Sequence, residues 1–124
     1  MASKILIADN ESNLLISLEY LMQREGFEVC LASDGDEALK KIRADVPDLV
    51  ILDAMMPGRT GFDVCQEIHS DPSLRQIRVV MLSAKARETD IAKGKAMGAN
   101  AYIVKPFSTR DLIEQVHSLL GNPQ

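Results

Sequence analysis

Five short apolar runs, each about the length of one strand, constrain the fold of this chain more than any other feature. They are rich in β-branched residues and lie at 5–8, 27–31, 49–52, 79–82 and 101–104. Their hydrophobicity is nearly continuous, whereas a strand with one face in water alternates apolar and polar residues. The sequence therefore predicts a parallel sheet that is covered on both faces.

The segments between these runs carry the spacing of amphipathic helices. Apolar residues recur at helical intervals in two of them, at 14, 15, 18, 21 and 22 and at 112, 113, 116, 119 and 120. Gly26 is predicted to end the first helix, and Gly121 with Pro123 the last. Three further helices are predicted over 37–44, 62–70 and 89–97, although Gly94 interrupts the apolar pattern of the last one.

Strict alternation of strands and helices, repeated five times, predicts a doubly wound α/β fold with right-handed crossovers. A chain of 124 residues has the size of one domain, so a single domain is expected over 1–124. In such folds ligands bind beyond the carboxyl ends of the strands, near the point where the strand order reverses. The residues that follow each strand are therefore the candidate site.

Composition and charge exclude several classes of protein. With 46% hydrophobic and 26% charged residues, the chain has the balance of a globular domain. No apolar run approaches the roughly 18 residues that span a bilayer, and the N-terminus is too short for a signal peptide, so a cytoplasmic protein without a membrane anchor is expected. The formal net charge of −4 argues against direct binding of nucleic acid.

Polar side chains follow four of the five predicted strands. They are Asp9-Asn10-Glu11, Asp53, Ser83-Ala84-Lys85 and Lys105-Pro106. Because parallel strands end at the same edge of a sheet, two carboxylates, a hydroxyl and an ammonium are expected to meet there. Carboxylates held close together repel each other unless a proton or a cation is shared, and ligands that are all oxygen favour Mg²⁺. Taken alone, Asp9 would be read as a helix N-cap and Asp53 as the end of a strand.

These residues resemble the receiver domain of two-component response regulators, and in particular its single-domain chemotaxis type, over essentially the whole chain. The resemblance is carried by the acidic turn at 9–10, the run Leu-Asp-Ala-Met-Met-Pro-Gly-Arg-Thr-Gly at 52–61, the Ser-Ala pair at 83–84 and Tyr-Ile-Val-Lys-Pro-Phe at 102–107. Their joint occurrence at these spacings is highly specific. The resemblance implies a flavodoxin-like sheet with the strand order 2-1-3-4-5.

The resemblance also implies the chemistry of the acidic residues. Asp53 would accept a phosphoryl group from a phosphohistidine on a sensor histidine kinase or a phosphotransfer protein, forming an acyl phosphate. Asp9, Asn10, Asp53 and the backbone carbonyl of Met55 would arrange Mg²⁺. A carboxylate is ionised at neutral pH and needs no general base, and phosphoryl transfer depends mainly on positioning and charge neutralisation. Such a domain is a signalling switch, with at most slow self-dephosphorylation.

The remaining matching residues would read out the modification. Lys105 would neutralise phosphoryl oxygens and Ser83 would hydrogen-bond one of them, and Tyr102 would swing inward when Ser83 moves. The Lys105–Pro106 peptide bond is cis in the family. Met55 and Lys85 flank the path of the attacking water in the family, so a thioether and an ammonium at these positions are expected to slow hydrolysis.

Two other functions were weighed against this one. Asn10 stands where the family more often has a second acidic residue, which leaves open a pseudo-receiver that binds partners without being phosphorylated. A nucleotide- or flavin-binding enzyme is not supported, because no GxGxxG or GxxxxGK[ST] loop follows any strand. The glycines at 58 and 61 are either an ordinary loop after a strand or a device that shapes the approach to Asp53.

A basic surface is predicted in the second half of the chain. Residues 1–62 carry six basic and eleven acidic side chains, whereas 63–124 carry eight and seven. The basic residues cluster near the fourth helix, at 85, 87, 93 and 95, with Arg110 at the start of the fifth. In receivers the face made by helix 4, strand 5 and helix 5 meets an effector or a second receiver.

Histidines and cysteines are assigned no chemistry. His69 and His117 are expected to be solvated on helix faces. Cys30 and Cys65 fit no metal-ligand spacing and are expected to be small buried hydrophobic residues.

Overall fold

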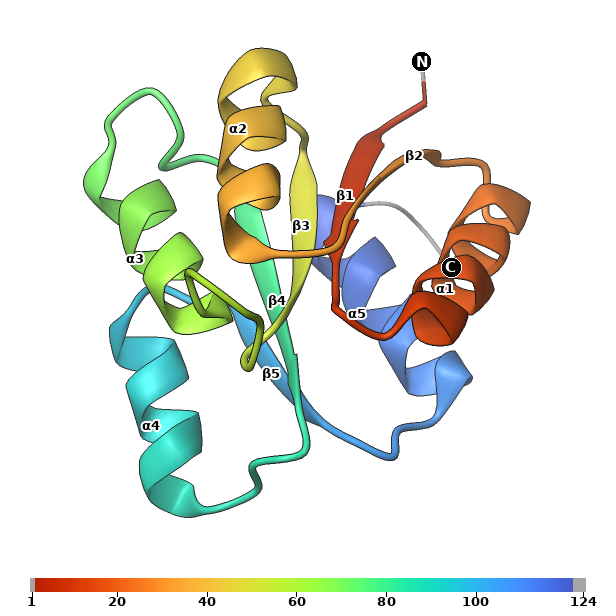
Figure 1. Ribbon diagram of the computed structural model, residues 1–124. Helices are drawn as coiled ribbons and strands as arrows, with labels where there is room; N and C mark the ends of the chain where they lie inside the picture. Colours follow the sequence, from red (N-terminus) through yellow and green to blue (C-terminus); the bar gives the residue numbers. More distant parts are fainter. Residues whose placement is uncertain (1, 122–124) are drawn as a thin grey trace.

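The structure is a computed structural model that describes residues 2–121. Its strands are β1 (Lys4–Ala8), β2 (Glu28–Ala32), β3 (Leu49–Asp53), β4 (Arg78–Ser83) and β5 (Ala101–Val104), and its helices are α1 (Ser12–Arg24), α2 (Gly35–Asp45), α3 (Gly61–Ser70), α4 (Glu88–Ala96) and α5 (Thr109–Leu120). All strand pairs are parallel, and the strand order is β2-β1-β3-β4-β5 (Figure 1). The predicted fold class and strand order are confirmed.

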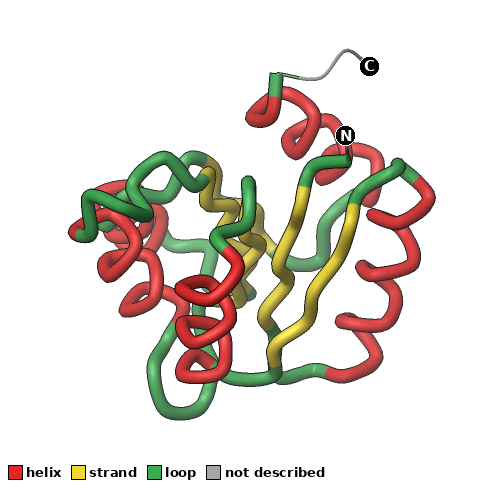
Figure 2. The backbone as a smooth tube through the Cα atoms, turned by 90° about the horizontal axis from the view of Figure 1, so that it is seen from above, coloured by secondary structure: helices red, strands yellow, loops and turns green. Residues whose placement is uncertain are grey.

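Helices cover both faces of the sheet, which explains the nearly continuous apolar runs. Helices α1 and α5 lie on one face, and α2, α3 and α4 lie on the other (Figures 1 and 2). Alternate residues of β1 face opposite layers: Ile5 and Ile7 pack toward α1 and α5, whereas Leu6 and Ala8 pack toward α2 and α3. Every residue of the central strand β3 is buried. The sheet is thus a rigid apolar platform for the polar groups at its edge.

Several helices begin earlier than their apolar pattern, because capping residues precede that pattern. Helix α2 begins after Asp34, whose side chain accepts a hydrogen bond of 2.8 Å from the Glu37 backbone N–H. Helix α5 begins after Ser108, whose hydroxyl accepts from the Asp111 backbone N–H at 3.3 Å. These side chains satisfy backbone donors that have no partner within the helix. At the other end, Gly121 adopts a left-handed conformation that closes α5.

The prediction that His117 is solvated is wrong. Its side chain is only 12% exposed, and its Nε2 lies 2.8 Å from Glu25 Oε1. The imidazole ring also packs beside Phe27, with 5.2 Å between the ring centroids. Glu25 and Phe27 follow α1, on the layer that α5 shares, so tertiary packing covers a residue that looked polar in sequence. His69, by contrast, is exposed as expected.

The two cysteines differ in their burial. Cys65 is buried, and burial raises the pKa of its thiol to about 12, whereas Cys30 is only half-buried. No helix within residues 2–121 is long and apolar enough to cross a bilayer. Pro123, predicted to help end the last helix, lies outside the described residues.

Candidate functional site

The carboxyl ends of β1, β3 and β4 bring three polar side chains to one edge of the sheet. Asp9 follows β1, and Asp53 and Ser83 are the last residues of β3 and β4. Their exposed fractions are only 1%, 7% and 0%, and they stand out as buried polar residues beside an apolar core. The strand order reverses at β1 and β3, so the site lies at the switch point where doubly wound folds bind ligands.

Lys105 brings a positive charge to these carboxylates. Its Nζ donates a hydrogen bond of 3.1 Å to Asp9 Oδ2 and lies 3.6 Å from Asp53 Oδ2 and 4.0 Å from Glu11 Oε1. It follows β5, and the Lys105–Pro106 peptide bond is cis. The Lys105 backbone N–H donates to the Ser83 carbonyl at 2.8 Å, which ties this segment to the end of β4. One ammonium therefore serves two buried carboxylates.

The surroundings shift the pKa values of both Asp53 and Lys105. Burial raises the pKa of Asp53, and the negative charge of Asp9 raises it further, against the opposing effects of the Met55 N–H and of Lys105. Burial by itself lowers the pKa of Lys105, but the hydrogen bond to Asp9 and the charges of Asp53, Asp9 and Glu11 outweigh it, so that this pKa is raised. Asp53 is thus a carboxylate in an environment that disfavours its charge, which is typical of functional sites.

Asp9 does not cap the following helix. The residue before α1 is Glu11, whose side chain makes no capping hydrogen bond, whereas Asp9 Oδ1 accepts from the Glu11 backbone N–H at 2.8 Å. One Asp9 oxygen is therefore used to shape the turn, and the other contacts Lys105. Asn10 is an exposed residue of the turn that follows the buried Asp9.

The loop after Asp53 is held by its own backbone and by α3. The Met55 N–H donates to Asp53 Oδ1 at 3.2 Å, while the Met55 side chain is 49% exposed. The Gly61 N–H donates to the Ala54 carbonyl at 2.9 Å. A Cβ atom on Gly61 would overlap the backbone carbonyl oxygen of Asp53, so only glycine lets α3 begin this close to the strand. Gly61 therefore shapes the environment of Asp53.

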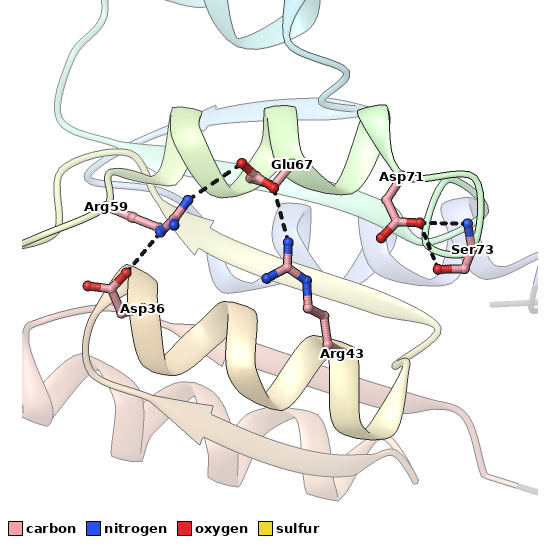
Figure 3. A network of polar contacts seen from close by, with 6 residues as sticks. All are labelled: Asp36, Arg43, Arg59, Glu67, Asp71 and Ser73. Carbon is pink, nitrogen blue, oxygen red and sulfur yellow. Dashed lines mark hydrogen bonds and ion pairs between the residues drawn. The ribbon is translucent and has the colours of Figure 1, made fainter.

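A chain of ion pairs also fastens this loop to its neighbouring helices. Arg59 lies 2.9 Å from Asp36 of α2 and 3.5 Å from Glu67 of α3, and Glu67 lies 3.0 Å from Arg43 of α2 (Figure 3). These side chains are about half exposed, so each pair contributes little by itself. Together they join the loop, α2 and α3 around the central Arg59.

On the other side of the site, Ser83 is connected to Tyr102 through the backbone of Lys85. The Lys85 N–H donates to Ser83 Oγ at 3.0 Å, and the Tyr102 hydroxyl donates to the Lys85 carbonyl at 2.9 Å. The Tyr102 ring is half-buried and packs against the core under α2, α3 and α4. The structure thus brings Asp9, Asp53 and Lys105 into contact, and it connects Tyr102 to Ser83 through the Lys85 backbone.

The donors at this edge fit a hard divalent cation. Mg²⁺ is usually held by one or two carboxylates together with neutral oxygens and water. Asp9 and Asp53 supply two buried carboxylates that share a single ammonium, and an amide oxygen is available on Asn10. Glu11 also lies near Lys105, 4.0 Å from its Nζ, and within residues 2–121 no three acidic, histidine or cysteine side chains are arranged as ligands of one metal ion.

Comparison with known proteins agrees with this architecture. The model of the family described as "Response regulator receiver domain" matches residues 5–117, and the chain belongs to this family. It is therefore the receiver domain of a two-component response regulator, a signalling domain of a family in which phosphorylation and Mg²⁺ binding are typical.

Individual relatives give the same result. The chain is 39% identical over 120 residues to the alkaline phosphatase synthesis transcriptional regulatory protein PhoP of Bacillus subtilis, covering 97% of this chain and 49% of that protein. It thus spans about half the length of this curated relative. A putative response regulator from Chloroflexus aurantiacus superposes with a TM-score of 0.92 at 30% identity, covering 98% and 100% of the two chains. The chemotaxis protein CheY4 of Vibrio cholerae superposes with a TM-score of 0.89 at 28% identity, covering 96% of this chain and 99% of that chain.

Sequence reasoning missed two contributions to the site. The motif at 52–61 gives Arg59 no role of its own, although its side chain bridges Asp36 of α2 and Glu67 of α3. Gly94 was seen only as an interruption of a helical pattern, although it is the buried residue of α4. A signal was present for Gly94, because a glycine inside a helix often has a packing reason.

Proposed function

We propose that this receiver domain is a phosphoacceptor switch and that Asp53 is its nucleophile. The observation that carries the proposal is the buried pair Asp9 and Asp53 with Lys105 Nζ at 3.1 and 3.6 Å. An Asp53 carboxylate oxygen would attack the phosphorus of a phosphohistidine on a sensor histidine kinase or a phosphotransfer protein. A P–O bond forms, the P–N bond breaks, and the imidazole leaves with the electron pair.

The surrounding residues have distinct roles in this proposal. Asp9, Asn10, Asp53 and the Met55 carbonyl would hold Mg²⁺, which supplies charge neutralisation when bound. Lys105 would pair with phosphoryl oxygens, exchanging part of its contact with Asp9 for a new one. The Ser83 hydroxyl would donate to a phosphoryl oxygen. Because Ser83 Oγ also accepts from the Lys85 N–H, its reorientation would be felt by the loop that Tyr102 contacts.

The direct test is an intact-mass measurement after incubation with acetyl phosphate and Mg²⁺. We expect the mass to increase by one phosphoryl group, and we expect EDTA to prevent the increase. Absence of any increase at millimolar Mg²⁺ would favour the second candidate function, a pseudo-receiver that binds partners without phosphorylation. The observation behind that alternative is Asn10, an amide where the family more often has a second acidic residue.

Hydrolysis of the acyl phosphate is predicted to be slow because of Met55 and Lys85. Met55 is half exposed next to Asp53, and Lys85 is half-buried two residues after Ser83. A thioether side chain can obstruct the attacking water, and an ammonium can hold phosphoryl oxygens. The double variant Met55→Asn with Lys85→Glu is therefore expected to lose the phosphoryl group about tenfold faster, as followed by mass after removal of acetyl phosphate. An unchanged or slower rate would refute this role.

Asn10 is predicted to weaken Mg²⁺ binding in the unphosphorylated protein. A unit charge about 4 Å from another at an effective dielectric constant near 20 corresponds to roughly 4 kcal/mol of gross attraction, an upper limit that repulsion from Asp9 and Asp53 partly cancels. Asn10→Asp is therefore expected to tighten Mg²⁺ about tenfold, or about 1.4 kcal/mol, in a calorimetric titration. Equal affinities of the two proteins would place Asn10 away from the metal.

The output of the switch is proposed to be a change in protein binding at the face made by α4, β5 and α5. Lys95 is exposed on α4 and Arg110 is exposed at the start of α5, whereas the Lys93 ammonium is directed toward Phe62 of α3. An acidic surface on an effector or a second receiver would be complementary to these charges. The Bacillus subtilis relative is named as a transcriptional regulator, and this chain matches 49% of its length.

A further inference from the structure

Helix α4 is seated on the rest of the domain through a glycine. Gly94 is the buried residue of this helix. A Cβ atom on Gly94 would lie 2.7 Å from Cδ2 and 3.1 Å from Cε2 of Tyr102, and 3.6 Å from the Phe62 ring. Real Cβ atoms do not approach other heavy atoms to 2.7 Å, so the tyrosine ring occupies space that any other residue would need. The absence of a side chain at position 94 is therefore a condition for the observed position of Tyr102.

The position of this ring has consequences at the phosphorylation site. Its hydroxyl donates to the Lys85 carbonyl at 2.9 Å, and the N–H of the same residue donates to Ser83 Oγ at 3.0 Å. A continuous path of contacts thus runs from α4 through the Tyr102 ring and the Lys85 backbone to the Ser83 hydroxyl. This path consists of two hydrogen bonds and the close approach of the Tyr102 ring to the Gly94 backbone, and none of these contacts requires a bound ligand.

The two partners of the Gly94 contact differ in their freedom to move. Gly94 is part of the α4 backbone, where its carbonyl accepts from the Ala99 N–H at 3.0 Å, and the neighbouring Lys93 Nζ lies 4.6 Å from the centroid of the buried Phe62 ring. The Tyr102 ring is half-buried and has solvent on one side. A methyl group at position 94 would therefore displace the ring outward more readily than it would lift the helix.

We propose that Gly94 is the positioning residue for Tyr102: it admits the ring beneath α4 and thereby holds the hydroxyl on the Lys85 carbonyl. The structural part of this inference needs no phosphorylation. Its signalling consequence rests on the proposed function, because only there does the inward tyrosine report on Ser83. Gly94→Ala would favour an outward ring and weaken the link between the site and α4.

The test uses tyrosine fluorescence, because the chain has two tyrosines and no tryptophan. Tyr20 is 63% exposed on α1, so Tyr20→Phe leaves Tyr102 as the single reporter with little disturbance. In this background, Gly94→Ala is expected to raise the acrylamide quenching constant of Tyr102 at least twofold. Lys95→Ala is the matched control, since it places alanine at an exposed neighbouring position of α4, and it is expected to leave the constant unchanged. Equal quenching in all three proteins would overturn the proposal.

A stability measurement provides a second, independent test. Alanine has a higher helix propensity than glycine, so Gly94→Ala should stabilise α4 unless the methyl group collides with Tyr102. We expect Gly94→Ala to raise the midpoint of urea unfolding when Tyr102→Ala has removed the ring, and to lower it when the ring is present. An identical shift in the two backgrounds would show that positions 94 and 102 are not coupled and would overturn the proposal.

These tests separate this inference from the proposed function. The quenching comparison is repeated with Asp53→Asn, which removes the proposed nucleophile, and the same twofold difference is expected. Persistence of the difference supports the positioning role of Gly94 even if the domain is never phosphorylated. Its disappearance would refute that role, because the contacts that define it do not include Asp53.

Discussion

Asp53→Asn is expected to abolish labelling by acetyl phosphate. An amide preserves the shape of the side chain but is a poor nucleophile, and it removes one of the two buried negative charges that would attract Mg²⁺. Intact-mass measurement with excess acetyl phosphate and Mg²⁺ should show complete loss of the phosphorylated species. Asp111→Asn provides the matched control, because it makes the same chemical change on an exposed carboxylate of α5, and its labelling should equal that of the wild type. Labelling of Asp53→Asn at an undiminished rate would exclude Asp53 as the acceptor.

The same substitution is expected to stabilise the fold while it removes the activity. Asp9 and Asp53 are both buried and share one ammonium, and burial and the charge of Asp9 raise the pKa of Asp53. Removing one charge leaves Lys105 paired with Asp9 and relieves repulsion worth on the order of 1 kcal/mol. Urea unfolding in EDTA at neutral pH should therefore show a higher midpoint for Asp53→Asn. Asp111→Asn, which removes a carboxylate from the first turn of α5, should show no increase of the midpoint. A lower midpoint for Asp53→Asn would mean that the carboxylates are not in conflict.

Gly61→Ala is expected to cause a large loss of stability. The added methyl group would overlap the Asp53 carbonyl oxygen and would lie 2.8 Å from the Asp53 carbonyl carbon and 2.9 Å from Ala54 Cα. These backbone atoms belong to the last residue of the fully buried strand β3 and to the residue that follows it. They therefore cannot move aside as a flexible side chain would. We expect a loss of about 2–4 kcal/mol in the free energy of unfolding, measured by urea denaturation.

The control for Gly61→Ala is Gln66→Ala, which introduces alanine at an exposed position of the same helix. Its effect should stay within about 0.5 kcal/mol of the wild type. Neither substitution changes Thr60 or Asp63, whose capping box has hydrogen bonds of 3.0 and 3.2 Å in the wild type. If Gly61→Ala were as stable as Gln66→Ala, α3 would be free to shift, and Gly61 would be an ordinary loop glycine.

The elements of the fold were predictable from the sequence because local patterns specify them. The run 49–52 reads as a strand buried on both faces, and the structure has β3 at Leu49–Asp53. Helix ends were less accurate, since the prediction began α2 at 37 and the structure begins it at Gly35, after the Asp34 cap. The edge of the sheet that carries the site also followed from the sequence, because parallel strands necessarily end together.

The roles of Asp53 and Lys105 came from resemblance to a family, and the structure adds the arrangement that makes those roles physically reasonable. Nothing in the local sequence states that Lys105 hydrogen-bonds Asp9, ninety-six residues away, and lies slightly farther from Asp53. That preference depends on where β5 and the turn after β1 lie in space. As a result, Lys105 Nζ lies closer to Asp9 Oδ2, at 3.1 Å, than to Asp53 Oδ2, at 3.6 Å.

What the sequence by itself determined is therefore the set of elements, the face each buries and the identity of the polar residues at the strand ends, because periodicity and connectivity act over short distances along the chain. Only the tertiary structure decided which of these side chains touch. His117 looked solvated until it met Glu25, and Gly94 looked like a flaw in a helix until Tyr102 filled the space beside it. Such contacts join residues from different elements, and their energies depend on separations of a few ångströms that packing of the whole domain sets.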